Sequence, residues 1–175
     1  MIGQFHFPGA VMHVLKALAA LALPGVIALA QAPEPAKDLS PAYASQLVRK
    51  AVAFAKSNGM DKLIEETNRA GGQFHVASGG ELYIFIYDQK GTTKAIGFNT
   101  EKLVGSNRWD LKDEDGVYFV QELIKRVQTK GRGWVEYKYP NPATHKTELK
   151  VSFVEGCQDL VIGSGTYKGD SALPE

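Results

Sequence analysis

The sequence predicts an α+β domain, in which one antiparallel sheet of five strands is covered by a long N-terminal helical segment. Three observations lead to this fold class. Apolar residues recur at helical spacing between residues 41 and 68. Two runs rich in β-branched and aromatic residues follow at 81–88 and 92–98, joined by a turn that contains Gly91. Three more strand-like runs, separated by turn residues, lie between residues 131 and 167.

Residues 1–30 have the features of a secretory signal peptide. Lys16 precedes an apolar run that ends in Ala-Leu-Ala at Ala30. The run is shorter than the roughly 20 apolar residues that a membrane-spanning helix requires. We therefore expect cleavage between Ala30 and Gln31, export to the periplasm or the exterior, and no stable membrane anchor afterwards.

Two alternatives stay open at this end. Residues 4–10 carry no Lys or Arg, so Met12 is a second candidate initiation site. An uncleaved anchor or a buried helix is the alternative to cleavage. The polar segment 31–40, which we interpret as a linker, favours cleavage.

Two helices are expected next. Ser40 can cap the first helix, Pro41 suits its first turn, and Gly59 ends it. Asp61 is expected to cap a shorter helix that runs to Asn68. The first helix carries an apolar stripe, made of Leu47, Val48, Ala51, Val52, Phe54 and Ala55. The stripe predicts a cover for one sheet face, and a signalling helix is the alternative interpretation.

The run 81–88 is apolar on both faces, because Tyr83, Phe85 and Tyr87 alternate with aliphatic residues. This pattern predicts an interior strand of a covered sheet, paired with 92–98 in a hairpin.

A long polar connection, residues 99–116, follows, and connections of this length are usually functional. Asp110, Asp113 and Asp115 invite a calcium interpretation, but they lack the ligand spacing of an EF-hand. We therefore expect Asp115 to cap the next helix instead.

That helix has an apolar stripe of Val120, Leu123, Ile124 and Val127, and Gly131 ends it. The strand that follows places Val135, Tyr137 and Tyr139 on one face and Trp134, Glu136 and Lys138 on the other. Large groups on both faces predict a strand covered on both sides, by a helix on one and with a ligand as a candidate cover on the other.

The last two strands are expected at 147–154 and 160–167. Lys150 shares a face of the first with polar neighbours. Gly163 and Gly165 share a face of the second, where the missing side chains would leave room for a small guest. Residues 169–175 are expected to form a loose tail.

Composition narrows the function classes. The net charge of +1 gives no electrostatic basis for nucleic-acid binding. The single cysteine, Cys157, cannot form an internal disulfide. The motif search finds no catalytic His/Asp/Ser set, no metal-ligand spacing and no phosphate-binding glycine loop. We therefore expect no enzyme activity and no cofactor.

Seven short segments, taken in order, resemble those of the single Cache domain, type 2. They are Tyr83-Ile-Phe-Ile-Tyr-Asp88; Gly91; Asn99 with Leu103-Val-Gly-Ser-Asn107; Asp113-Glu-Asp-Gly116; Gly133-Trp-Val-Glu-Tyr-Lys-Tyr-Pro-Asn-Pro142; Lys150-Val-Ser-Phe153; and Ile162-Gly-Ser-Gly-Thr-Tyr167. The resemblance covers about residues 41–167, so we assign a single Cache-like domain to 41–168.

The resemblance implies a PAS-like antiparallel sheet behind a long N-terminal helix, with an extracytoplasmic pocket for a short carboxylate or another small metabolite. Most such domains sit in chemoreceptors or sensor kinases between two membrane spans. Here the signal peptide and the absence of a second apolar run predict a standalone domain. Gly97-Phe98 also stands where the family often has His-Pro, which alters that side of the pocket.

A small carboxylate needs a cation or several donors, with apolar walls for its tail. Lys150 can supply the charge, the tyrosines can supply hydroxyl donors and flat walls, and Arg108 can grip a carboxylate in bidentate fashion. Trp134 is as readily a packing anchor. The predicted ligand-binding residues are Tyr83, Trp134, Tyr137, Tyr139, Lys150, Asn107 and Arg108.

We therefore expect a soluble periplasmic module that binds or senses a carboxylate of two to four carbons. It would deliver the acid, or signal its binding, to a membrane-bound signalling or transport partner. The alternative is a protein-interaction module of the cell envelope that binds a partner through its exposed helix and takes no small ligand.

Overall fold

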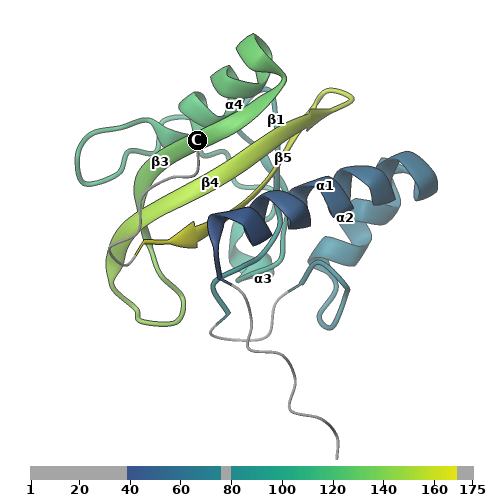
Figure 1. The fold of residues 1–175 in the computed structure, drawn as a ribbon, viewed down its shortest axis with the longest axis horizontal. Helices are drawn as coiled ribbons and strands as arrows, with labels where there is room; N and C mark the ends of the chain where they lie inside the picture. The colour runs from purple at the N-terminus through teal and green to yellow at the C-terminus, as the bar shows by residue number, and fades with distance from the viewer. Residues whose placement is uncertain (1–38, 76–79, 169–175) are drawn as a thin grey trace, which may run out of the picture. The chain divides into compact units, whose positions relative to one another are not determined.

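The computed structural model divides the chain into two units, Met1–Pro35 and Ala36–Glu175. It describes residues 39–75 and 80–168, all within the second unit (Figure 1). The predicted signal peptide, its cleavage site at Ala30 and Gln31, most of the predicted linker and the predicted tail lie outside the described residues.

Five strands form one antiparallel sheet in the order β2-β1-β5-β4-β3. They are β1 (Phe85–Asp88), β2 (Thr93–Ile96), β3 (Arg132–Pro140), β4 (Thr147–Cys157) and β5 (Leu160–Tyr167). The α+β class and the five-stranded antiparallel sheet are therefore confirmed. The strand β3 lies at an edge of the sheet, and its side chains pack on both faces, with Val135 and Tyr137 in one apolar cluster and Trp134 against the other.

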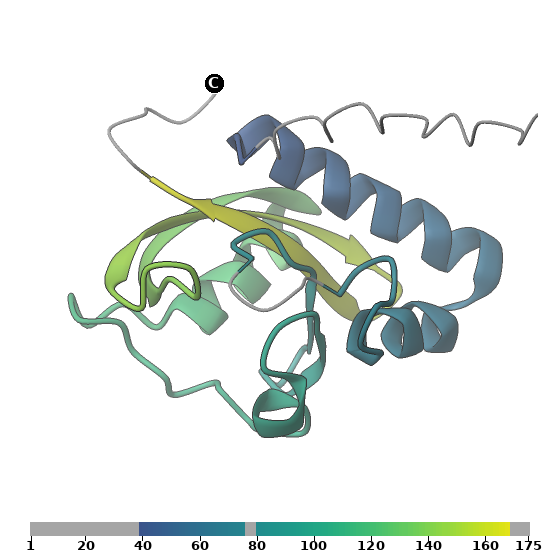
Figure 2. The ribbon, with the colours of Figure 1, turned by 90° about the horizontal axis from the view of Figure 1, so that it is seen from below.

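Helices cover both faces of the sheet (Figure 2). On one face, α1 (Pro41–Asn58) packs on β4 and β5, and α2 (Met60–Asn68) packs on β2. On the other face, α4 (Phe119–Lys130) packs on β3 and β4. Side chains alternate along each strand, so every central strand contributes to two separate apolar clusters.

The helix boundaries follow local chemistry, with two corrections. The hydroxyl of Ser40 accepts the N–H of Tyr43 at 3.2 Å, which confirms the cap of α1. The cap of α2 is Gly59, at φ 92°, and not Asp61. The cap of α4 is Tyr118, and not Asp115.

The connection 99–116 is more ordered in its backbone than its sequence indicates. It contains a one-turn helix, α3 (Thr100–Leu103), and a bridge between Thr92 and Asn107. The carboxylate of Asp113 accepts the backbone N–H groups of Asp115, Val117 and Lys138, and so fastens the connection to β3. Asp113 thus serves the backbone, whereas Asp115 forms an ion pair with the side chain of Lys138 at 2.9 Å.

The expectation of empty space beside the glycines of β5 is wrong. A Cβ atom added to Gly163 would lie 2.3 Å from ring carbons of Phe85, and one added to Gly165 would lie 2.2 Å from the hydroxyl oxygen of Ser152. Neighbouring side chains occupy the space, so these glycines permit close packing of the sheet and leave no room for a guest.

We predict that Gly163→Ala lowers the free energy of unfolding by about 1–3 kcal/mol, because the new methyl group overpacks against Phe85. Urea denaturation of the single variant and of Gly163→Ala/Phe85→Leu measures the effect. The smaller Leu should recover part of the loss. If the two substitutions were additive, the proposed close packing would be wrong.

Candidate functional site

Lys150 is a buried lysine in the middle of β4. Its side chain is only 1% exposed. The amine Nζ donates to the phenol oxygen of Tyr83 at 2.7 Å and to that of Tyr167 at 3.3 Å. The Tyr167 hydroxyl in turn donates to the carbonyl of Pro140 at 2.8 Å. The amine therefore lies inside the protein on neutral oxygen atoms.

Aromatic rings surround the same nitrogen. Nζ of Lys150 lies 4.0 Å from the ring centroid of Tyr83, 4.7 Å from that of Tyr167 and 5.4 Å from that of Tyr139. The negative faces of these rings attract a cation, and the effect is stronger away from water. We call Lys150, Tyr83, Tyr139 and Tyr167 the phenol cage.

Among the residues that the structure describes, no carboxylate forms an ion pair with Lys150. Glu81 is near enough to favour its charge, but a carboxylate oxygen of Glu81 is taken by the amide of Asn141 at 2.7 Å. The same amide donates to Glu148 at 2.9 Å. Asn141 is itself buried, so both acids are held apart from the lysine by a fixed amide.

Burial lowers the pKa of Lys150 well below its usual range, because the charged amine loses its water. Glu81 opposes this shift and Arg108 adds to it. Burial also raises the pKa of Tyr83, so the phenol stays neutral. A cation is thus disfavoured in the cage unless an anion joins it.

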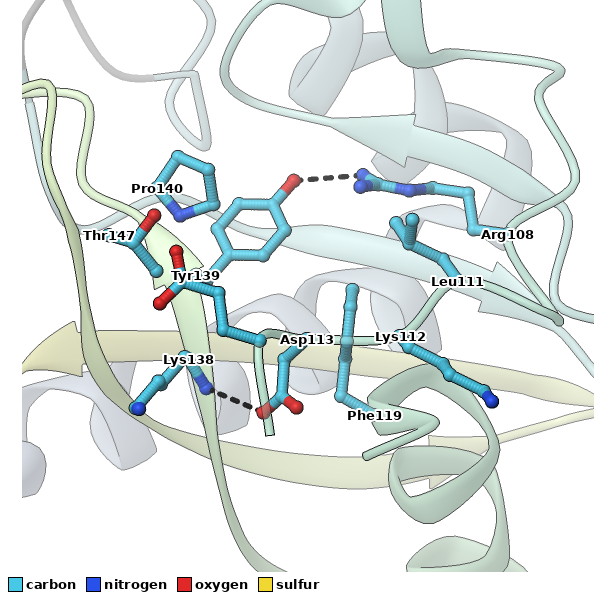
Figure 3. A pocket seen from close by; sticks show the side chains of 10 residues that line it. Arg108, Leu111, Lys112, Asp113, Phe119, Lys138, Tyr139, Pro140 and Thr147 are labelled. Carbon is cyan, nitrogen blue, oxygen red and sulfur yellow. Dashed lines mark hydrogen bonds between the residues drawn. The ribbon is translucent and has the colours of Figure 1, made fainter. Parts of the chain in front are cut away.

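Arg108, from the connection 99–116, approaches the cage from its outer side. Its Nη1 donates to the phenol oxygen of Tyr139 at 2.9 Å, and its Cζ lies 5.5 Å from that ring's centroid (Figure 3). A cavity of about 310 Å³ opens beside this pair. We call it the rim cavity; it is lined by Arg108, Leu111, Lys112, Asp113, Glu114, Phe119, Lys138, Tyr139, Pro140 and Thr147 (Figure 3).

Tyr139 belongs to both parts of the site. Its ring lines the rim cavity, and it also lies near Nζ of Lys150. Phe119 of α4 supports the ring edge-on at 5.6 Å between centroids. The side chains of Lys150 and Arg108 therefore both lie near one phenol ring, that of Tyr139.

Five of the seven predicted residues come together here, and two do not. Tyr137 lies next to the cage, stacks on Phe119 at 4.6 Å, and shares a hydrogen bond of 2.9 Å with Ser152. Trp134 lies on the opposite face, packed edge-on against Phe153, because alternate residues of a strand face opposite ways. Asn107 donates to the carbonyl of Lys90 and holds the connection to the β1–β2 turn, away from the cage.

Tyr167 is the residue that sequence reasoning missed. A two-residue turn between β4 and β5 fixes the register so that Lys150 pairs with Tyr167. Counting back from that turn would have found it. The link from Glu81 to Asn141 joins residues 60 apart in the chain, and no local pattern signals it.

The profile of the family described as Single Cache domain 2 matches residues 26–172. The chain belongs to the Single Cache domain 2 family. Domains of this family are extracytoplasmic sensors that bind small ligands, and they are not enzymes. No helix within residues 39–75 and 80–168 is long and apolar enough to cross a membrane.

Solved structures of Cache domains share the fold. A methyl-accepting chemotaxis protein from Vibrio parahaemolyticus is 26% identical, with a TM-score of 0.60 over 72% of this chain and 86% of that one. A periplasmic sensor domain of a chemotaxis protein is 24% identical, with a TM-score of 0.56 over 73% and 90%. A Cache chemosensory domain described for carboxylic acid recognition is 24% identical, with a TM-score of 0.55 over 73% and 88%.

We predict that Lys150 gives the stability of the domain a distinctive pH dependence. Its pKa is lowered in the folded state, so between that value and the ordinary lysine pKa of about 10.4 the unfolded chain binds the extra proton. The free energy of unfolding should therefore rise with pH, relative to Lys150→Met, by up to about 1.4 kcal/mol per pH unit.

Urea denaturation between pH 6 and pH 9 measures this difference. Lys62→Met, which removes an exposed lysine paired with Glu65, is the control and should show no such slope. The prediction would be contradicted if the difference in the free energy of unfolding between wild type and Lys150→Met stayed constant over this pH range.

Proposed function

We propose that this Cache domain senses a carboxylate of two to four carbons, bound between Lys150 and Arg108. The observation that carries the proposal is a fully buried lysine whose described partners are phenols and not an acid. An isolated buried charge is costly, and a buried site that lacks its counter-charge is suited to receive one from a ligand. Charge-assisted hydrogen bonds of this kind contribute about 1.5–3 kcal/mol each.

The dimensions of the site favour a small ligand. The rim cavity, at about 310 Å³, lies at the lower end of the range of small-molecule pockets. Leu111, Phe119 and Pro140 give it apolar walls, which suit a short hydrocarbon tail. Arg108 at its inner end suits the bidentate hold of a carboxylate.

Tyr139 is proposed as the side chain that yields when the ligand enters. It bonds to Arg108 and packs near Lys150, so a carboxylate that replaces its hydroxyl would contact both cations. Tyr139 is half-buried, whereas Tyr83, Lys150 and Tyr167 are buried, so its side chain is the one in the cage that can most readily change rotamer.

Known Cache domains support this ligand class by analogy. One structural neighbour is described as the basis of carboxylic acid recognition by a Cache chemosensory domain, and it shares the fold with this chain. We further propose that the domain acts outside the cytoplasm after removal of its signal peptide, and passes its ligand state to a membrane-bound signalling or transport partner.

We predict that acetate, propionate, lactate or pyruvate raises the melting temperature of the domain, and that Lys150→Met abolishes the rise. At a ligand concentration of 100 times Kd, binding raises the free energy of unfolding of the domain by about 2.7 kcal/mol. Differential scanning fluorimetry, followed by calorimetry on any acid that stabilises, measures it. Lys168→Met, which removes a surface lysine paired with Glu136 at 2.7 Å, should bind like wild type.

The same experiment separates function from folding. Folding of the wild type removes the amine from water and disfavours its proton, and an apolar side chain of similar size avoids that cost, so ligand-free Lys150→Met should be no less stable than wild type at pH 7. If no acid stabilised the wild type, the carboxylate proposal would be rejected in favour of a protein-interaction module. Equal binding by Lys150→Met would place the ligand elsewhere.

A further inference from the structure

We infer that Lys150 takes up a proton from solution when the anion binds, so that the domain reads the acid and the pH together. The inference rests on the proposed function, since it concerns the same site. Three observations lead to it: the number of hydrogen-bond acceptors in the cage, the charged groups that surround the amine, and the effect of a bound carboxylate on the pKa of Lys150.

A neutral lysine amine has two N–H groups, and the cage offers one hydrogen-bond acceptor for each of them. Two acceptors are present, the phenol oxygens of Tyr83 and Tyr167. The Tyr167 hydroxyl already donates to Pro140, so it can only accept from the lysine. A protonated amine has three N–H groups, and the contacts described for Nζ supply partners for two. The third requires an acceptor that a carboxylate would bring.

The charges that face the amine do not replace that acceptor. From the segment before β1, Glu81 favours the charged amine through space, but the contacts described for Nζ include no bond to it, and one of its oxygens accepts from Asn141. From β4 itself, Glu148 is held by Asn141 and by Thr144.

On the remaining sides, β3 and β5 present the phenols of Tyr137, Tyr139 and Tyr167. Burial raises the pKa of Tyr137 and that of Tyr167, so neither becomes an anion near neutral pH. The connection 99–116 presents a second cation, Arg108, which lowers the pKa of Lys150 further. From α4, Phe119 contributes an apolar ring beside Tyr139. The ligand-free cage therefore favours the neutral amine.

A bound carboxylate reverses these conditions. It supplies the missing acceptor and a negative charge beside the amine, and both raise the pKa of Lys150. Short carboxylic acids are already ionised near neutral pH, so the proton comes from the solvent: one anion and one proton bind together. Between the lowered pKa of the free state and the higher pKa of the bound state, affinity should fall by up to tenfold for each pH unit of increase.

Calorimetry tests this on the mature chain, with acetate, propionate, lactate and pyruvate as the probes. Each is titrated at several values between pH 6 and pH 9, in HEPES and in Tris, whose ionisation enthalpies differ. If binding takes up one proton, the buffer releases it. The binding enthalpies measured in the two buffers should then differ by the difference between the ionisation enthalpies of HEPES and Tris. We expect an uptake that approaches one proton, together with an affinity that decreases as pH rises.

Two variants test whether Lys150 is the group that takes up the proton. Lys168→Met should keep the same uptake, because its amine pairs with Glu136 and not with the cage. Lys150→Arg carries a guanidinium that stays protonated, so binding by this variant should occur without uptake. Binding by the wild type with no proton uptake at any pH would overturn the inference and leave the proposed function standing. Absence of binding by all four probes would reject both.

Discussion

The cost of burying one amine governs the candidate site. Lys150 is only 1% exposed, and phenol oxygens and aromatic rings surround its amine. A hydrophobic residue of the same size would fit the cluster without that cost. The amine therefore lowers the stability of the ligand-free domain. A bound anion is the kind of ligand that offsets this cost most directly.

The rest of the fold holds this amine in place. The β4–β5 register sets Tyr167 opposite Lys150, and the β3–β4 register sets Tyr137 opposite it on the other side. Close packing at Gly163 and at Gly165 removes free volume on the same sheet face, beside the cage. The connection 99–116 supplies Arg108, which bonds to Tyr139 of β3.

The layout of the domain could be predicted from periodicity because each element buries one face. The span of β5 was predicted as observed, Leu160–Tyr167, and the expected start and end of α1 also hold. Lys150 stood out because a lysine without a partner on an inner face of the sheet would be costly. Tertiary partners were harder: Asn141 bridges Glu81 and Glu148 across the chain, and no local pattern encodes such a link. The faces beside the glycines were misjudged because the side chains that fill them come from neighbouring strands.

The most direct test of the central claim is the protonation state of the buried amine itself. Two-dimensional NMR of protein labelled at the lysine Cε follows every lysine during a pH titration, and Lys150→Met identifies the resonance of interest. We predict that this resonance titrates well below the surface lysines in the free protein, and moves toward them when the stabilising acid is bound. A Lys150 resonance that titrates with the surface lysines, and does not respond to any acid, would contradict the claim.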